Sequence, residues 1–294
     1  MMNMINRRYC KTRLDITGVF GYPVKHSLSP AMQNAAFKKA GLNTVYLPFA
    51  VKPAECAFLI KKLPALGITG INLTIPHKET GFQNVEYLSR DAKICRAVNT
   101  ITVKNGKLYG TSTDGEGLLR ALKYAAGLDI RNKSVIILGA GGAGRSAGIY
   151  LAVKGAKRII IANRTADKAL STVKLIKKAA PKVEAFFVPL KESVIRKYCT
   201  GSELIINATS LGLRNTDRPV LGPKAFRKNI IFYDMIYNPA MTATMRAAKR
   251  GGANVYNGLS MLLFQGALSW ELWTGKKAPL QVMEKALSRN LFKE

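Results

Sequence analysis

The feature that most constrains the fold of this chain is a glycine-rich turn between an apolar β-type run and a helical run. Gly139, Gly141 and Gly144 directly follow SVIIL (134–138) and precede SAGIYLAVKG (146–155). Glycines at this spacing permit a tight turn and let the backbone approach a pyrophosphate, and the next helix offers oriented N–H groups. Glycines also serve ordinary strand-to-helix turns, but the strand before and the helix after favour a dinucleotide site.

The region around this turn contains six β-type runs separated by helical patterns. They are SVIILG, RIIIAN, VEAFFVP, ELIINAT, IIFYDMIY and ANVY. An open dinucleotide-binding sheet needs such a set of strands with intervening helices. We therefore predict a Rossmann-type domain over residues 119–258.

The chain before this region shows the same alternation from Asp15 onward, which indicates parallel strands with crossover helices. Ser29 followed by Pro30 has the form of a helix N-cap with proline at the first helical position, and Gly41 suits the end of that helix. Asn105-Gly106 is typical of a hairpin turn.

The length of 294 residues suits two domains of ordinary size. The last helical runs, LSMLLFQGALSWELW (259–273) and PLQVMEKALSRN (279–290), have no further strands to pair with and are expected to pack on the first domain. We predict a two-domain α/β protein. Residues 1–14 form a basic tail, residues 15–118 plus 259–294 form a substrate-binding and catalytic domain, and residues 119–258 form the dinucleotide-binding domain.

The formal net charge of +29 would attract nucleic acid, anionic lipid or acidic metabolites without specifying which. Lys and Arg occur as singles and pairs, with no long basic block and no aromatic-interleaved RNA-binding pattern. This distribution favours a generally basic proteome as the origin of the charge. No specific nucleic-acid partner is expected, and a nucleic-acid-binding module is the most distant alternative.

The cysteines and the apolar segments indicate a cytoplasmic protein. Cys10, Cys56, Cys95 and Cys199 stand alone, with no CxxC pair, and with only two histidines we predict no metal site. The N-terminal segment lacks the apolar core of a signal peptide. The most apolar later stretch, residues 259–273, is too short for a bilayer, so no membrane span is expected.

The end of the second strand of the Rossmann region distinguishes the two nicotinamide cofactors. An NAD site carries an acidic side chain about 20 residues after the glycines, to bind the ribose 2′-hydroxyl. This chain has Asn163-Arg164-Thr165 there, followed by Lys168. The two cations could bind a 2′-phosphate, which favours NADP. The alternative is that both cations are only solvated at a surface turn.

Polar side chains cluster at predicted strand ends in four segments, HSLSP, NLTIPHK, AVNT and TSTDG. They include Ser27, Ser29, Thr74, Lys78, Asn99, Thr113 and Asp114. Such groups suit a small polyhydroxylated anion. Each also has a structural alternative as a helix cap, strand residue or turn former, and spacing alone leaves these open.

These segments resemble the motifs of the shikimate dehydrogenase family, in order, from about Gly21 to Gly275. The resemblance rests on GYPVKHSLSP, GINLTIPHKE, RAVNTI, GTSTDGEG, GAGGAGRSA, NRT, INATSLGL, YDMIYNP and NGLSMLLFQGA. It implies a two-domain α/β enzyme that reversibly reduces 3-dehydroshikimate to shikimate with NADPH.

The resemblance also implies a role for individual residues. Lys78 and Asp114 would form the catalytic pair, and Ser27 and Ser29 would bind the substrate carboxylate. Substrate contacts would also come from Thr74, Asn99, Thr113, Asp114, Tyr237 and Gln265. The pyrophosphate would lie on Gly139, Ala140, Gly141, Gly142 and Ala143, the adenosine phosphate on Asn163, Arg164, Thr165 and Lys168, and the nicotinamide against Met235 and Gly258.

The segment Thr111-Ser112 and the residue His77 depart from the pattern of the family, and neither departure removes a group with assigned chemistry. An enzyme that also acts on quinate would share the fold and is the main alternative. A methylene-tetrahydrofolate dehydrogenase fits HSLSP and STDG poorly, and a non-catalytic sensor would be expected to lack Lys78 or Asp114. A monomer or a homodimer is expected.

Overall fold

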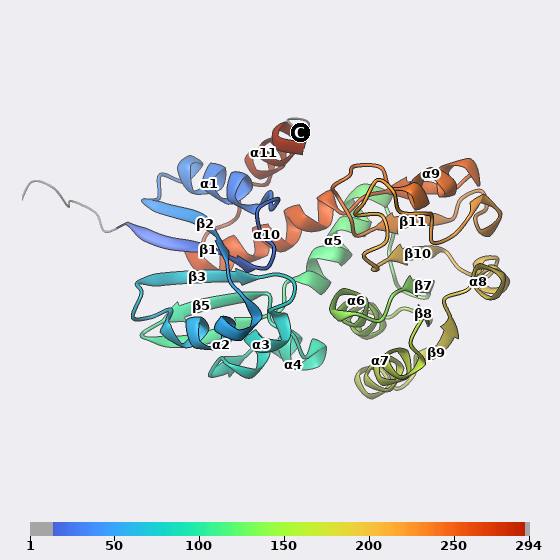
Figure 1. Ribbon diagram of the computed structural model, residues 1–294, viewed down its shortest axis with the longest axis horizontal. Coiled ribbons are helices and arrows are strands. Elements are labelled where there is room, and N and C mark those ends of the chain that lie inside the picture. The colour runs from blue at the N-terminus through green and yellow to red at the C-terminus, as the bar shows by residue number, and fades with distance from the viewer. Residues whose placement is uncertain (1–13, 292–294) are drawn as a thin grey trace, which may run out of the picture. The chain divides into compact units, whose positions relative to one another are not determined.

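The structure, a computed structural model, describes residues 14–291 (Figure 1). The described chain divides into two compact units. The first contains residues 14–89, 98–111 and 267–291, and the second contains residues 90–97 and 112–266. Of the predicted basic tail, residues 1–14, all but Leu14 lie outside the described residues, as does Cys10.

The first unit is built on a mixed six-stranded sheet with the order β2-β1-β3-β5-β6-β4. Its strands are β1 (Asp15–Gly21), β2 (Thr44–Ala50), β3 (Ile68–Leu73), β4 (Tyr87–Leu88), β5 (Thr100–Lys104) and β6 (Lys107–Thr111). β1 pairs in parallel with β2 and β3, and β5 pairs antiparallel with β3 and β6. Asn105 and Gly106 have φ angles of 51° and 73°, which confirms the predicted hairpin turn.

The helices of the first unit are α1 (Ser29–Lys39), α2 (Pro53–Lys62), α3 (Lys78–Gln83) and α11 (Leu280–Leu291), with the second half of α10 (Leu259–Thr274). α1 begins at Ser29 with Leu28 as its N-cap, so the prediction of Ser29 as the N-cap was wrong by one residue. The Ser27 hydroxyl oxygen accepts the N–H of Ser29, the first residue of α1, at 3.3 Å. Gly41, with φ 64°, follows the helix as predicted.

The C-terminal helices return to the first sheet, as predicted. Trp270 of α10 is buried against Phe37 of α1, with ring centroids 6.0 Å apart. Trp273 donates its indole N–H to the Ile101 carbonyl at 3.0 Å. A Cβ on Gly70 would collide with the indole ring of Trp273, so only glycine allows this close approach.

The second unit is built on a fully parallel six-stranded sheet with the order β12-β11-β10-β7-β8-β9. Its strands are β7 (Ser134–Leu138), β8 (Arg158–Asn163), β9 (Glu184–Pro189), β10 (Leu204–Asn207), β11 (Ile231–Asp234) and β12 (Asn254–Tyr256). Its helices are α4 (Arg90–Cys95), α5 (Asp114–Ala126), α6 (Gly142–Val153), α7 (Ala166–Ala179), α8 (Glu192–Cys199), α9 (Ala243–Arg250) and the first half of α10, with a 3₁₀ turn η1 (Pro223–Ala225). The six predicted strands are all present.

Helices cover both faces of this sheet, so its central strands are apolar throughout. All five residues of β7 are buried. On one face, a Cβ on Gly148 of α6 would lie within 3.4 Å of Ile137, Ile161 and Ile176. On the other face, residues of α8, η1 and α9 join one buried cluster with Ile136 and Ile160. This is the doubly wound arrangement that the sequence predicts.

Within residues 14–291, no helix combines the length and the apolar character that crossing a bilayer requires.

Candidate active site

Five of the predicted site residues lie on segments that meet at one edge of the first sheet. β1 and β3 are parallel and end at this edge, and the antiparallel strand β5 begins there. Phe20 of β1 pairs with Leu73 of β3, and Leu73 donates its N–H to the Asn99 carbonyl at 2.8 Å. The segments that follow β1 and β3 and precede β5 carry Ser27, Ser29, Thr74, Lys78 and Asn99. The fold thus gathers hydroxyl, amide and ammonium groups from distant parts of the sequence.

Backbone hydrogen bonds tie the segment after β1 to the segment after β3. Thr74 donates its N–H to the Phe20 carbonyl at 3.0 Å, and Tyr22 donates to the Ile75 carbonyl at 3.1 Å. A Cβ on Gly21 would come within 2.5 Å of the Thr74 methyl group, so the two segments touch where the glycine lacks a side chain. The position of Thr74 is therefore fixed by its contacts with the segment at the end of β1.

Lys78 is the first residue of α3 and is half-buried. Its carbonyl accepts the Val98 N–H at 3.0 Å, which holds the start of α3 beside Asn99. The preceding residue, His77, is buried, and its Nε2 lies 2.8 Å from the Val51 carbonyl oxygen. Burial lowers the pKa of His77, although the hydrogen bond opposes this. His77 therefore supports the loop as a buried hydrogen-bonding group.

Asn72, which the sequence reasoning missed, lies behind Asn99. The Asn72 amide donates to the Asn99 carbonyl at 3.0 Å and to the hydroxyls of Thr100 and Ser269 at 3.1 and 2.9 Å, and its oxygen accepts the Tyr46 hydroxyl at 2.8 Å. A buried amide is costly unless it is bonded, and this one is fully bonded. An asparagine between the apolar residues Ile71 and Leu73 was the signal in the sequence.

The remaining polar candidates belong to the second unit. Asp114 begins α5 with Thr113 as the N-cap residue, so Asp114 is not the cap of this helix. The Thr113 hydroxyl donates to the Gln265 carbonyl at 3.1 Å, which joins the start of α5 to α10. Asp114 is only 7% exposed. Tyr237 is half-buried in the segment after β11.

The glycine-rich turn follows β7 and has the geometry that a pyrophosphate site needs. Gly139 has φ 103°, a left-handed conformation that favours glycine, and a Cβ on Gly144 would collide with the Gly139 carbonyl oxygen. A Cβ on Gly141 or Gly142 would meet nothing within 4 Å. Within the described chain, no side chain caps the N-terminus of α6. The open space and the helix N-terminus together fit a phosphate group.

Asn163, at the end of β8, holds the glycine-rich turn in place. Its Oδ1 accepts the Ala140 N–H at 3.2 Å, and its amide donates to the Thr165 carbonyl at 2.8 Å. Arg164, Thr165 and Lys168 are exposed beyond it. Asp167, also exposed in the first turn of α7, is a nearby carboxylate that the sequence reasoning did not weigh.

Met235 and Gly258, both predicted to line the nicotinamide, are neighbours in the structure. Met235 donates its N–H to the Asn207 carbonyl at 3.0 Å, and Gly258 donates to the Ile236 carbonyl at 3.0 Å. A Cβ on Gly258 would collide with the Met235 carbonyl oxygen. The chain can approach this closely only because residue 258 is glycine.

A fully buried carboxylate, Asp234, joins the loops after β10 and β11, and the sequence reasoning missed it. Its Oδ1 accepts the Asn207 amide at 3.0 Å and the Ile236 N–H at 3.1 Å, and its Oδ2 accepts the Thr242 hydroxyl at 2.8 Å. Burial raises the pKa of Asp234, while these hydrogen bonds oppose the shift. The network fixes the loop that begins with Met235.

Comparisons with known proteins place these features in one family. Residues 19–101 match the model described as Shikimate dehydrogenase substrate binding domain, residues 121–217 match Shikimate / quinate 5-dehydrogenase, and residues 258–287 match Shikimate 5'-dehydrogenase C-terminal domain. A protein of Methanopyrus kandleri, named Shikimate dehydrogenase (NADP(+)), is 41% identical over 279 residues, which cover 94% of this chain and 96% of the relative. The chain belongs to the shikimate dehydrogenase family.

Solved structures of shikimate dehydrogenases share the whole fold. One, solved in complex with NADP+, is 37% identical with a TM-score of 0.87 and covers 95% of this chain and 96% of its own. The enzyme from Thermus thermophilus, solved with NADP(H) and shikimate, is 34% identical with a TM-score of 0.83, covering 94% of this chain and 99% of its own. The fold class that the sequence predicts is therefore confirmed as that of the shikimate dehydrogenase family.

Proposed function

We propose that this chain catalyses the reversible NADPH-dependent reduction of 3-dehydroshikimate to shikimate. The observation that supports this most is the edge of the first sheet, where the segments carrying Ser27, Thr74, Lys78 and Asn99 meet. Its relatives named Shikimate dehydrogenase (NADP(+)) match nearly the full length of the chain. Residues 15–118 plus 259–294 would form the substrate-binding and catalytic domain, and residues 119–258 the NADP-binding domain.

The cofactor is NADP, whose reduced form, NADPH, would supply the hydride when bound. The pyrophosphate fits the backbone from Gly139 to Ala143, since the space above Gly141 and Gly142 is open. The 2′-phosphate is assigned to the segment from Asn163 to Lys168, where Arg164 is exposed and can donate paired hydrogen bonds. Met235 and Gly258 are assigned to the nicotinamide.

Lys78 acts as the general acid in reduction and as the general base in oxidation. Negative charge develops on the carbonyl oxygen as the ketone is reduced, and an ammonium group can donate a proton to it. The Asp114 carboxylate is assigned as the partner of Lys78 in orientation and proton exchange. Its burial at the start of α5 supports this role, because a buried carboxylate interacts strongly with a cation.

Ser27 and Ser29 are assigned to the substrate carboxylate. The Ser27 oxygen accepts the Ser29 N–H, and a serine hydroxyl can donate its own proton to an anion while it accepts such a bond. Ring hydroxyls and the carboxylate are assigned to Thr74, Asn99, Thr113, Asp114, Tyr237 and Gln265. These residues supply both donors and acceptors, which a polyhydroxylated acid requires.

The partners are therefore small molecules, with no specific nucleic acid expected. The protein would act in the cytoplasm as a monomer or a homodimer. Size-exclusion chromatography with light scattering decides the oligomeric state, and a larger assembly would contradict this part of the proposal.

The decisive experiment measures NADPH formation from shikimate and NADP+, with quinate and NAD+ as controls. The highest kcat/KM is expected for shikimate with NADP+. The family model over residues 121–217 is described for both shikimate and quinate, so a broader quinate/shikimate dehydrogenase is the second candidate. Comparable turnover of quinate would favour that candidate, and a preference for NAD+ would overturn the cofactor assignment.

A further inference from the structure

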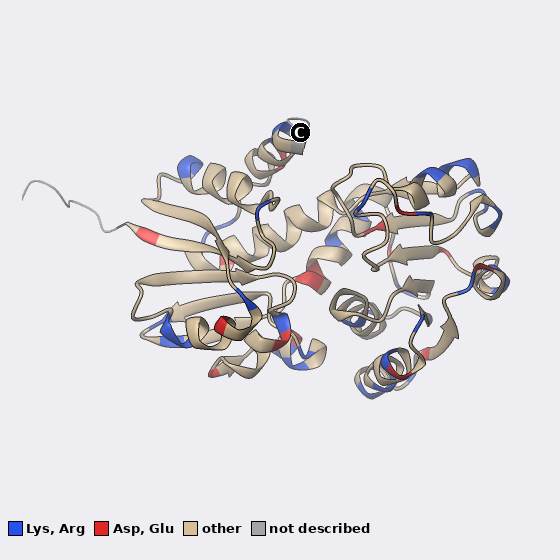
Figure 2. Cartoon of the chain, viewed as in Figure 1, with Lys and Arg blue, Asp and Glu red and all other residues tan. Residues whose placement is uncertain are grey.

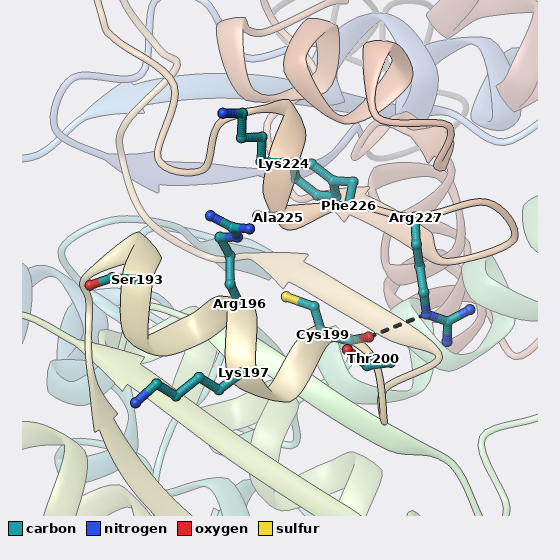
Figure 3. A pocket seen from close by; sticks show the side chains of 9 residues that line it. All are labelled: Ser193, Arg196, Lys197, Cys199, Thr200, Lys224, Ala225, Phe226 and Arg227. Carbon is teal, nitrogen blue, oxygen red and sulfur yellow. Dashed lines mark hydrogen bonds between the residues drawn. The ribbon is translucent and has the colours of Figure 1, made fainter.

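The second unit contains a pocket of about 450 Å³ between α8 and the segment that includes η1. Figure 3 shows its lining side chains, which come from these two elements. They are Ser193, Arg196, Lys197, Cys199, Thr200, Lys224, Ala225, Phe226 and Arg227. A volume of this size falls within the range of small-molecule sites, about 300–1,000 Å³.

Hydrogen bonds between the two elements hold this pocket open in one shape. At one end, the Glu192 carboxylate accepts the Gly222 N–H at 2.9 Å. At the other end, the Arg227 guanidinium donates to the carbonyl oxygens of Cys199 at 3.4 Å and Ser202 at 2.9 Å. These bonds fix the backbone of the two elements, whereas the side chains of Arg196, Lys197 and Lys224 are exposed and would be ordered by a ligand.

The side chains that line the pocket carry a high positive charge. Four basic side chains line the pocket, and no carboxylate among the described residues does so. Glu192, the nearby acid, is turned to the Gly222 N–H. In Figure 3, Arg196 extends toward Lys224, whereas Lys197 points away from both. Arg196 and Lys224 lie on one side of the pocket in Figure 3, and Arg227 lies on the other side, bonded to the Cys199 carbonyl. These three cations are the candidate ligand groups.

The Arg227 guanidinium is the best-fixed cation of the three. It bonds three carbonyl groups through its Nε and both terminal nitrogens, which leaves one N–H on each terminal nitrogen for a ligand. Hydroxyls of Ser193 and Thr200 add neutral donors. Burial raises the pKa of the Cys199 thiol to about 11, so this sulfur does not serve as a thiolate. The pocket offers anion recognition rather than nucleophilic chemistry.

The pocket lies at the edge of the sheet opposite to the glycine-rich turn. α8 and the 223–227 segment lead into the first residues of β10 and β11, which pair as Leu204 with Ile231. The glycine-rich turn follows the last residue of β7, Leu138, and β7 runs parallel to β10. A ligand in this pocket is therefore distinct from a dinucleotide on the turn.

We propose that this pocket binds a small phosphorylated anion, of the class of pyrophosphate and phosphomonoesters. Phosphate oxygens match the paired N–H groups of arginine, and an anion with two or more negative charges can interact with the cations on both sides of the pocket. A nucleic acid is less suited, because it requires an extended basic groove that follows a backbone. The other basic residues of the unit are distributed over several helices and loops, among them α4, α5, α7 and α9 (Figure 2).

The test titrates inorganic pyrophosphate into the full chain saturated with NADP+, using isothermal calorimetry. Saturable binding to one site is expected. The double variant Arg196→Ala/Lys224→Ala should weaken it by about 10- to 100-fold, the loss of two charge-assisted contacts to an anion. The control, Lys174→Ala/Lys178→Ala, removes the same charge from exposed positions of α7 and should bind as the wild type does.

Without pyrophosphate, the wild type and the two double variants should have the same rate of shikimate turnover and the same thermal unfolding midpoint. Neither variant changes a proposed catalytic residue. Absence of saturable pyrophosphate binding would overturn the proposal. Equal weakening in both double variants would also overturn it, since general charge would then explain the binding. Binding of a single-stranded RNA oligonucleotide that depends on Arg196 and Lys224, without pyrophosphate binding, would assign the surface to nucleic acid instead. The titration is repeated without NADP+. Binding that still depends on Arg196 and Lys224 then supports the pocket even if the cofactor assignment is wrong.

Discussion

Replacing Asp234 tests whether a buried carboxylate holds the loops of the second unit. The Asp234→Ala change would remove the acceptor for the Asn207 amide, the Ile236 N–H and the Thr242 hydroxyl. Each buried donor left without an acceptor costs about 1–3 kcal/mol. Asn207 keeps a second bond, to the Leu211 carbonyl at 3.2 Å, which reduces the loss. We expect the free energy of unfolding to fall by about 3–5 kcal/mol.

The Asp234→Asn variant separates the acceptor positions from the charge. Its side-chain oxygen can keep the bonds from Asn207 and Ile236, both made to Oδ1, and its amide can donate to the Thr242 hydroxyl oxygen. The expected loss is therefore about 1 kcal/mol or less. Urea unfolding followed by circular dichroism, with both midpoint and slope reported, measures the two changes. Asp129→Ala, which removes an exposed ion pair with Arg131, is the control and should leave the midpoint unchanged.

The wild type and the Asp234→Asn variant also give a test of pH dependence. Burial raises the pKa of Asp234 in the folded protein above the usual value of 3.8. Its contribution to stability is then fully present below that value and is lost as the pH rises through the folded-state pKa. The free energy of unfolding of the wild type, minus that of the Asp234→Asn variant, should decrease over this window. A difference that increases with pH, or an Asn variant as unstable as the Ala variant, would refute the reasoning.

Four further changes test the assigned sites. Lys78→Ala should lower kcat by about 10²- to 10⁴-fold with a smaller change in KM, and a variant that keeps most of its kcat ends the role of Lys78 as acid. Ser27→Ala should weaken shikimate binding by about 1–3 kcal/mol, so an unaffected KM removes Ser27 from the binding set. Arg164→Ala should raise KM for NADP+ far more than for NAD+; equal changes would leave Arg164 without a phosphate contact. Gly144→Ala should weaken NADP+ binding and lower stability, because its Cβ meets the carbonyl oxygen that begins the turn, whereas Gly141→Ala should keep the stability of the wild type, because its Cβ meets no protein atom within 4 Å.

The sequence predicts the strands and the glycine-rich turn well because local signals determine them. Apolar runs such as SVIIL are bounded by glycine, and both faces of their strands are buried. The hairpin at Asn105-Gly106 follows from the left-handed preference of those two residues. The N-cap of α1 is Leu28, one residue before the predicted Ser29, and the Ser27 hydroxyl accepts the Ser29 N–H. The local sequence pattern did not predict that hydrogen bond.

The supporting residues could not be predicted because their partners are distant in the sequence. Asp234 and Asn207 are 27 residues apart and meet only because β10 and β11 pair in parallel, with these two residues opposite each other. Asn72 reaches Ser269 across 197 residues. No periodicity identifies such pairs. A polar residue at the end of a buried strand is the only local indication, and it does not name its partner.

The supporting residues share one arrangement, which explains why the sequence assigned them no role. Asn72 lies behind Asn99, His77 is bonded to Val51 beside Lys78, and Asp234 lies behind Met235. Each is buried and bonds to the backbone or side chain of a loop rather than facing solvent. Loops that carry exposed polar groups lose backbone hydrogen bonds, and buried polar side chains restore them. Substitution of these residues should therefore change stability and KM together, whereas substitution of Lys78 should act mainly on kcat.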